Sequence, residues 1–161
     1  MGATLNMYRP FISYNYEYCY GYPHDYAYNI GVNPMVRQRL SNGQRVQQPG
    51  LPRIYLVDNG RLRWIVDADV YMGIFKDWKG ILSVNVQSYP QGPPLVRGTL
   101  LFKHPNNPRV YLYDKEDGRR WVKRWIVNPH TFNFYHFDWN KIQIKNPSTF
   151  NPPNGSNIVA R

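Results

Sequence analysis

PRIYLVD (residues 52–58) is followed closely by RWI (residues 63–65), and both strings recur as PRVYLYD (residues 108–114) and RWI (residues 124–126). Self-similarity of this kind indicates a tandem duplication of one small structural unit. The duplication decides the fold, because each copy has to form the same elements in the same order. Duplicated units usually serve packing and binding, so the pattern favours an interaction protein over an enzyme.

The tryptophans extend the correspondence downstream. Asp77-Trp78 in the first copy matches Asp138-Trp139 in the second, and the steps from Trp64 to Trp78 and from Trp125 to Trp139 are both 14 residues. One unit alone is too small to cover both sides of its hairpin. We therefore predict a structural core shared by the two units and formed by Trp64, Trp78, Trp125 and Trp139, in which each buried aromatic contributes on the order of 2–3 kcal/mol. The alternative is that these indoles are exposed platforms for a ligand.

Each unit is predicted to form a β-hairpin, a short helix and a third strand. Asn59-Gly60 is a tight-turn signal in the first unit, and Asp67 suits a helix N-cap. Asn128-Pro129 marks the helix start of the second unit. The predicted strands are residues 54–57, 62–66 and 81–86 in the first unit and residues 109–113, 121–127 and 141–145 in the second. The first helix is predicted at about residues 68–76, and a linking strand at residues 95–103.

The expected fold class is α+β and mostly β, with two tandem β-hairpin/short-helix/strand repeats packed into one small domain and an extended N-terminal arm. A chain of 161 residues is long enough for one such domain. The predicted boundaries are residues 1–50 for the arm, 51–95 for the first repeat, 96–146 for the linking strand and second repeat, and 147–161 for a loosely ordered tail rich in asparagine and proline.

The N-terminal stretch differs from the repeats in its tyrosines. Tyr14, Tyr16, Tyr18, Tyr20 and Tyr22 fall at every second position, so in a strand their rings share one face. Three interpretations stay open: an edge strand whose tyrosines cover the core, an arm laid across a neighbouring subunit, and a low-complexity tract. The arm is preferred, because tyrosine buries a large ring at interfaces while its hydroxyl stays hydrogen-bonded. These five tyrosines are therefore predicted to bind a partner.

The charge of the chain suggests an acidic partner. The net charge is +10 although only 19% of the residues are charged, which fits a nucleic acid, an acidic protein or an anionic polymer. The most basic point lies at residues 119–124, where Arg119, Arg120 and Lys123 are predicted to contact the partner. Strand alternation divides this segment between two faces, so a solvated basic surface is the simpler alternative.

The chain offers no recognisable catalytic set. Cys19 is the single cysteine, which excludes an internal disulfide and a cysteine zinc site. The four histidines have no metal-binding spacing. Asp77 and Asp138 are explained as turn caps or as partners of Arg63 and Arg124. Because nucleophile-elbow, phosphate-loop and dinucleotide motifs are missing too, we predict no enzyme activity, no cofactor and no catalytic, cofactor-binding or metal-binding residues.

The repeated motif resembles short tandem repeats of bacterial surface and secreted accessory proteins, in which Tyr-Leu, Gly-Arg, Arg-Trp-Ile and Asp-Trp-x-x-Ile segments follow one another. The second unit carries these segments as residues 110–112, 118–119, 124–126 and 138–142, and the first as residues 55–56, 60–61, 63–65 and 77–81. The resemblance covers residues 52–158 and implies a non-catalytic accessory or interaction module. The absence of a recognisable signal peptide or attached enzyme domain counts against a secreted, wall-binding role.

These features predict a non-enzymatic structural or interaction protein, a minor subunit of a larger assembly such as a virion or capsid. The arm would bind other protein subunits, and the basic surface would meet an acidic polymer or nucleic acid. The sequence contains no run of about 18 apolar residues, so we expect no membrane span. Without a signal peptide, synthesis in the cytoplasm is expected. The alternative functions are a carbohydrate-binding module with exposed tryptophan and tyrosine platforms, and a nucleic-acid-binding protein.

Overall fold

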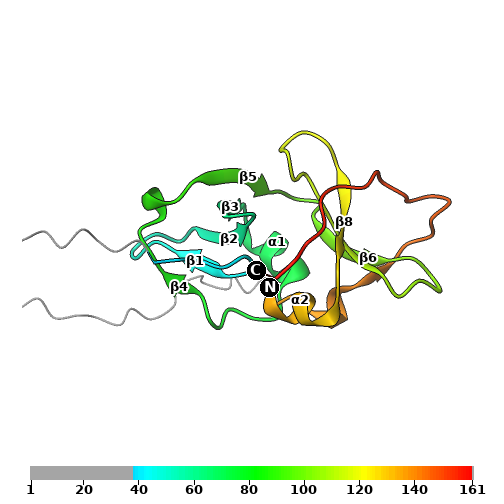
Figure 1. The fold of residues 1–161 in the computed structure, drawn as a ribbon, viewed down its shortest axis with the longest axis horizontal. Helices are drawn as coiled ribbons and strands as arrows, with labels where there is room; N and C mark the ends of the chain where they lie inside the picture. Colours follow the sequence, from blue (N-terminus) through cyan, green and yellow to red (C-terminus); the bar gives the residue numbers. More distant parts are fainter. Residues whose placement is uncertain (1–37, 161) are drawn as a thin grey trace, which may run out of the picture. The chain divides into compact units, whose positions relative to one another are not determined.

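The computed structural model describes residues 38–160, which form two β-sheets of similar topology (Figure 1). The first sheet has the strand order β4-β1-β2-β3-β5, and the second has the order β8-β7-β6-β9. The strands are β1 (Arg45–Gln47), β2 (Ile54–Asp58), β3 (Arg61–Ile65), β4 (Leu82–Ser83), β5 (Gln91–Leu95), β6 (Leu100–Lys103), β7 (Val110–Asp114), β8 (Val122–Ile126) and β9 (Gln143–Ile144). The helical segments are α1 (Ala68–Ile74), η1 (Val86–Ser88), α2 (Pro129–Phe134) and η2 (Trp139–Lys141).

The elements of the two repeats correspond one to one. The first repeat runs β1-β2-β3-α1-β4, and the second runs β6-β7-β8-α2-β9. In both repeats the first three strands pair antiparallel in sequence order, and the short last strand pairs parallel to the first. The expected fold class, α+β and mostly β with duplicated units, is therefore confirmed. Among the described residues no helix has the length and apolar character that a membrane crossing requires.

The first repeat begins earlier than predicted, because β1 is part of the sheet. β1 lies between β4 and β2, and its Val46 is fully buried. The turn before β1 needs a glycine: Gly43 has φ 90°, and a Cβ there would lie 2.9 Å from the ring of Tyr135 in the second repeat. The predicted arm of residues 1–50 therefore extends too far into the folded domain. Residues 1–37 lie outside the described residues.

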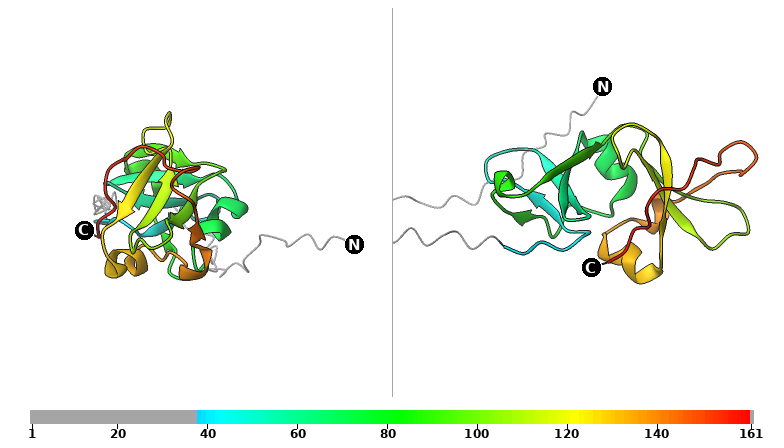
Figure 2. Two further views of the ribbon diagram at one scale, coloured as in Figure 1. Left: turned by 90° about the vertical axis from the view of Figure 1, so that its right-hand side faces the viewer. Right: turned by 45° about the horizontal axis from the view of Figure 1, so that its top comes forward.

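The expectation of a loosely ordered C-terminal tail is wrong for residues 153–158. This segment runs parallel to β8, as the red trace beside the yellow strand in Figure 2 shows, just as β5 runs parallel to β3. The Ile158 N–H donates to the Trp125 carbonyl at 2.8 Å, and the Ile158 side chain is buried like that of Leu95 in β5. The prediction of a loose tail was based on its high content of asparagine and proline, and it overlooked that the single residue Ile158 anchors the tail. The second repeat thus extends through the tail.

The turn and cap predictions are confirmed. Asn59 and Gly60 both have positive φ, 50° and 71°, as a two-residue hairpin turn requires. The side chain of Asp67 caps α1 by accepting from the Val70 N–H at 2.9 Å, and that of Asn128 caps α2 by accepting from the Thr131 N–H at 2.8 Å.

Several predicted strands are too long. The third strands, β4 and β9, have only two residues each. The linking strand predicted at residues 95–103 is split into β5 and β6 by a turn in which Gly98 has φ 96°. A continuous strand cannot pass through that backbone conformation.

The predicted tryptophan core is wrong, because the main core contains other side chains. It is built from leucines, isoleucines, phenylalanines and tyrosines of both repeats, such as Leu56, Ile74, Leu112, Phe132 and Tyr135. Trp64, Trp78 and Trp125 are only half-buried, and Trp139 is 46% exposed. The indoles therefore lie around the core, where Trp78 packs against its edge.

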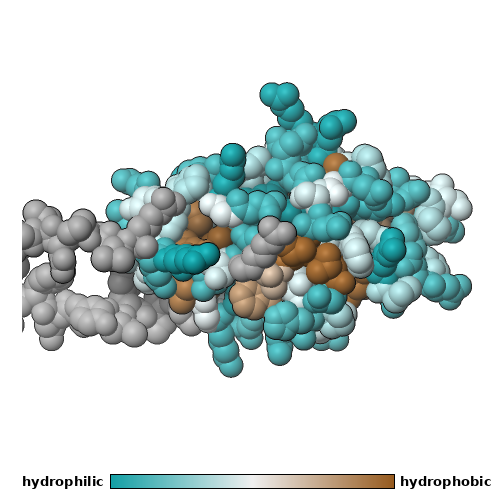
Figure 3. Space-filling view, in the orientation of Figure 1, coloured by the Kyte–Doolittle hydropathy of each residue, from teal (hydrophilic) through white to brown (hydrophobic). Residues whose placement is uncertain are grey.

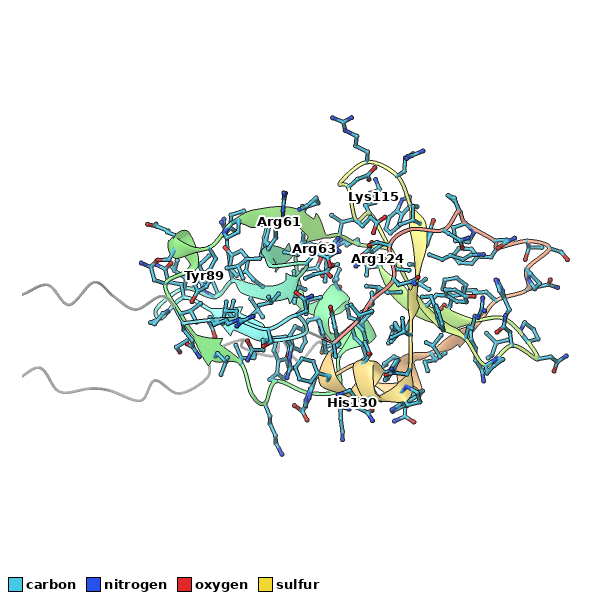
Figure 4. All side chains as sticks on the ribbon, viewed as in Figure 1. Arg61, Arg63, Tyr89, Lys115, Arg124 and His130 are labelled. Atoms are coloured by element: carbon cyan, nitrogen blue, oxygen red, sulfur yellow. The ribbon has the colours of Figure 1, made fainter. Side chains whose placement is uncertain are left out.

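Four buried charged residues join the two repeats. Arg63 Nη1 donates to Asp58 Oδ2 at 2.9 Å and to Asp114 Oδ2 at 2.7 Å. Arg124 Nη1 donates to Asp58 Oδ2 at 2.5 Å, and Arg124 Nη2 donates to Asp58 Oδ1 at 3.1 Å. Figure 4 shows the two arginines side by side where the two sheets meet. Because each arginine contacts an aspartate of the other repeat, we call these four residues the interlock.

The two aspartates of the interlock differ in their pKa. Burial by itself raises the pKa of Asp58, but the hydrogen bond and charge of Arg124 and the charge of Arg63 outweigh it, so the pKa lies below its ordinary value. Burial prevails at Asp114 and raises its pKa, against the opposing charges of Arg63 and Arg124. The Oδ1 atom of Asp114 is buried without a hydrogen-bond partner among residues 38–160, which explains the difference.

Candidate binding groove

A groove of about 340 Å³ lies at the end of the second hairpin where β7 begins and β8 leads into α2. Three aromatic side chains line it, namely Trp125, Phe132 and Trp139, together with prolines and the arginine Arg109. We call it the aromatic groove. On the face shown in Figure 3, apolar patches interrupt an otherwise hydrophilic surface.

Trp139 is exposed but held in place. Its ring stacks on Phe132 with 3.9 Å between ring centroids and 29° between the planes. Its Nε1–H donates to the Asn133 Oδ1 at 2.8 Å. An indole that is fixed on one side and 46% exposed loses little further freedom when a ligand stacks on it. Trp139 is therefore the best-prepared contact surface of the groove.

Arg109 contributes the positive charge of the groove. Its guanidinium carbon lies 4.9 Å from the centroid of the half-buried Trp125 ring, which is cation–π geometry. Its backbone N–H donates to Asn107 Oδ1 at 2.9 Å, which fixes the start of β7. Within the part of the chain that the structure describes, no carboxylate forms an ion pair with Arg109. This charge is thus available to a ligand.

The first repeat has an aromatic pair at the equivalent position, and hydrogen bonds hold this pair in place. Trp78 stacks on Tyr71 with 3.8 Å between centroids and 4° between planes. The Tyr71 hydroxyl donates to the Asp77 carbonyl at 2.8 Å, and the buried Arg45 donates to that hydroxyl and to the Asp77 and Lys79 carbonyls. These hydrogen bonds join β1, α1 and the chain after α1.

The second repeat lacks the residues that form these hydrogen bonds. Leu101 occupies the position of Arg45, because Arg45 pairs with Leu56 and Leu101 pairs with the equivalent Leu112. Phe132 occupies the position of Tyr71 and has no hydroxyl.

The predicted basic contact residues do not lie at the groove. Arg119 and Arg120 are exposed in the turn between β7 and β8, where both N–H groups donate to Asp117 Oδ1. The turn is at the opposite end of the hairpin, since Asp114 pairs with Val122 there. The amino group of Lys123 is bonded to Asn151 Oδ1 and lies 5.6 Å from the Tyr111 ring centroid. Lys123 thus contacts residues of its own chain, and it does not form one contact site with Arg119 and Arg120.

The other predicted sites have mixed outcomes. Tyr14, Tyr16, Tyr18, Tyr20 and Tyr22 lie outside the described residues, so their predicted role stays a prediction. Asp77 and Asp138 do cap turns, accepting from the Lys79 and Asn140 N–H groups at 2.8 and 2.9 Å. Their predicted pairing with Arg63 and Arg124 is wrong, because Asp58 and Asp114 take those partners.

A side-chain hydrogen bond also joins the two repeats at the surface. His136 Nε2 lies 2.9 Å from Asp77 Oδ1. This hydrogen bond, assisted by the Lys79 N–H, holds the pKa of Asp77 below its ordinary value. Residues 38–160 contain no group of three or more histidine, cysteine, aspartate or glutamate side chains arranged to hold a metal ion.

The sequence analysis missed Arg109 and Phe132 as groove residues. A signal for Arg109 was present, because Pro52-Arg53 and Pro108-Arg109 are repeated just before each hairpin. Arg53 indeed lies over Trp64 at the same distance, 4.9 Å. The sequence did not indicate that Phe132 lines the groove, because Phe132 and Trp139 come into contact only through the turn after α2.

Comparisons with protein-family models, with curated proteins and with solved structures found no match to this chain. The resemblance to bacterial surface repeats therefore stays a prediction, and the function has to be argued from the groove.

Proposed function

We propose that this protein is a non-catalytic saccharide-binding module whose aromatic groove holds a sugar ring. The observation that carries the proposal is Trp139, a 46% exposed indole that is already fixed by Phe132 and Asn133. The C–H groups of a pyranose ring carry a slight positive charge and stack on the electron-rich face of an indole. Exposing a large aromatic ring is otherwise unfavourable by roughly 1.5–3 kcal/mol relative to full burial.

The size of the groove supports a small ring-shaped ligand. Its volume of about 340 Å³ is at the lower end of small-ligand sites, which span roughly 300–1,000 Å³. Protein partners, by contrast, usually require a broad interface of about 800 Å² on each side. Nucleic acids would require several cations along a backbone, whereas Arg109 is the cation of this groove and Arg119 and Arg120 lie at the far end of the hairpin.

The strand beside the groove argues against peptide binding by strand addition. The Val127 N–H already donates to the Ile158 carbonyl, and the Ile158 N–H donates to the Trp125 carbonyl. An added peptide strand needs free backbone groups on the edge of a sheet. Because the C-terminal segment occupies this edge, recognition at the groove has to use side chains, and stacking on Trp139 meets that requirement.

The proposal is tested by titrating the protein with a panel of soluble neutral and acidic oligosaccharides while the tryptophan indole N–H signals are followed by NMR. We expect saturable shifts of the Trp139 signal with at least one member of the panel. Trp139→Ala should weaken that binding at least tenfold. Met72→Ala is the matched control, since Met72 is 47% exposed on α1 and should leave the affinity within twofold. A panel that leaves the Trp139 signal unmoved, or equal binding by Trp139→Ala, would contradict the proposal.

The predicted role as a subunit of an assembly such as a virion depends on the tyrosines of the arm, outside the described residues. It is compatible with a saccharide-binding groove, because the two surfaces are separate in sequence. Limited proteolysis and size measurement of the isolated protein test it: protection of the arm in a monomer contradicts docking of the arm on a neighbour.

A further inference from the structure

We infer that the aromatic groove selects a saccharide that carries a carboxylate, and that Arg109 is the residue that recognises it. This inference rests on the proposed function and deepens it, since it assigns the chemical class of the sugar. Three features of Arg109 support the inference: its cation–π contact with Trp125, its lack of a carboxylate partner among residues 38–160, and its place with Trp139 in the lining of the groove.

The cation–π contact of Arg109 with Trp125 uses none of its N–H groups as hydrogen-bond donors, and within residues 38–160 the Arg109 side chain forms no hydrogen bond. A guanidinium presents its N–H donors in one plane, in a fork that matches planar anions. Two of these donors match the two oxygens of a carboxylate and form a bidentate pair. Because Trp125 restrains the guanidinium, at 4.9 Å between its carbon and the ring centroid, less side-chain freedom is lost when a carboxylate binds.

The absence of an internal partner distinguishes Arg109 from several other arginines. Arg63 and Arg124 are consumed by the buried interlock. Arg97 pairs with Asp67 at 2.6 Å, and Arg120 lies 3.9 Å from Asp117. Among residues 38–160, Arg109 has no such carboxylate, although it lines the groove. A chain with a net charge of +10 also attracts an acidic ligand more strongly than a neutral one.

The groove combines both requirements of an acidic sugar. Trp139 supplies the stacking platform for the pyranose ring, and Arg109 lines the same groove from the start of β7. A sugar acid carries its carboxylate on the ring, so one ligand unit spans a platform and a cation within about 340 Å³. A neutral sugar uses the platform alone and leaves the guanidinium in water.

The first repeat provides a matched control for this residue. Arg53 precedes β2 as Arg109 precedes β7, and its guanidinium carbon also lies 4.9 Å from an indole centroid, that of Trp64. Arg53 does not line the aromatic groove. Substituting either arginine therefore removes one exposed charge and one cation–π contact, but only Arg109→Ala removes the charge at the groove.

The experiment uses two matched pairs of probes with the full chain at fixed ionic strength: trigalacturonate against its methyl ester, and sialyllactose against its methyl ester. Triglutamate is included as a carboxylate without a sugar. Binding is measured by calorimetry for the wild type, Arg109→Ala, Arg109→Lys and Arg53→Ala, after circular dichroism has verified folding. We expect the wild type to bind the acidic member of at least one pair about tenfold more tightly than the neutral member.

The variants decide whether Arg109 causes this preference. Arg109→Ala should reduce the preference to within twofold, Arg109→Lys should retain only part of it because lysine cannot form the planar pair, and Arg53→Ala should keep it whole. Equal wild-type binding within both pairs, a preference that survives Arg109→Ala, or failure of both acidic sugars to bind each overturns the inference. Tight Arg109-dependent binding of triglutamate overturns it too, since the carboxylate alone would then suffice. If neutral sugars still bind through Trp139, the proposed saccharide-binding function stands even though the inference about Arg109 fails. The proposed function itself fails only if no sugar of the panel binds through Trp139.

Discussion

The two repeats use the same backbone but treat their aromatic pairs differently. In the first repeat, Trp78 stacks on Tyr71, and Arg45 ties the pair to neighbouring carbonyls. In the second, Trp139 stacks on Phe132 beside an open groove. Duplication supplies two copies of one position, so one copy is free to serve stability while the other serves the binding that we propose. The difference depends on the pair of residues behind the indole.

The joint between the repeats does not show this divergence. Asp58 and Asp114 hold equivalent positions at the ends of β2 and β7, and Arg63 and Arg124 hold equivalent positions in β3 and β8. The repeats thus stay alike at their joint and differ in the buried residues behind the indole, which are Arg45 and Tyr71 in the first repeat and Leu101 and Phe132 in the second.

The largest expected effect concerns this shared joint. Arg124→Ala and Arg63→Ala should each lower the free energy of unfolding by about 3–5 kcal/mol, because each leaves two buried aspartates with one arginine in place of two. Urea denaturation followed by circular dichroism measures the loss. Arg97→Ala, at an exposed ion pair, is the control and should leave the urea unfolding curve nearly unchanged. Losses below about 1 kcal/mol for both interlock variants would show that the repeats do not depend on the interlock.

A smaller difference is expected between the two equivalent tryptophans. Trp78→Ala should lower the free energy of unfolding by about 3 kcal/mol, because its ring packs against the core and on Tyr71. Trp139→Ala should lower it by only about 1 kcal/mol, since half of its surface is already in water. Both values come from the same urea titration. Equal losses would remove the distinction between a stabilising and a binding aromatic pair.

Arg45→Leu gives the first repeat the residue that the second repeat has at Leu101. The substitution removes three hydrogen bonds of a buried arginine, so a loss of about 1–3 kcal/mol is expected. Hydrogen exchange of the Trp78 indole N–H, measured by NMR, should accelerate because Tyr71 loses its fastening. An unchanged exchange rate would mean that Arg45 does not account for the difference between the repeats.

The smallest effect concerns the surface contact between Asp77 and His136. Because the folded-state pKa of Asp77 is lowered, this contact stabilises the fold above the ordinary aspartate pKa of about 4 and is lost as the pH falls through the lowered value. The stability difference between wild type and Asp77→Asn should therefore be present at pH 6 and vanish near pH 2, in thermal unfolding across that range. Asp69→Asn, in the first turn of α1, tests whether any exposed aspartate behaves this way. A difference that persists unchanged at pH 2 contradicts the contact.

Local signals predicted the duplicated elements well. The Asn59-Gly60 turn and the Asp67 and Asn128 caps are determined by a few neighbouring residues, so the sequence was enough to place them. Strand lengths were less predictable, because β4 and β9 end where their partner strands end. The groove was anticipated only as an alternative role for the tryptophans, and neither Arg109 nor Phe132 was predicted to line it.

From the amino-acid pattern alone it follows that two equivalent hairpin units exist and that Arg124 and Trp125 point to opposite faces of their strand. Which of the two faces is buried depends on how the repeats pack against each other. Hydrophobicity places tryptophan in the core and arginine in water. Here the aspartates of both repeats neutralise Arg63 and Arg124 in the centre, and the tryptophans are left near the surface. No local pattern reveals this outcome, because the charges that permit it come from residues far apart in the chain.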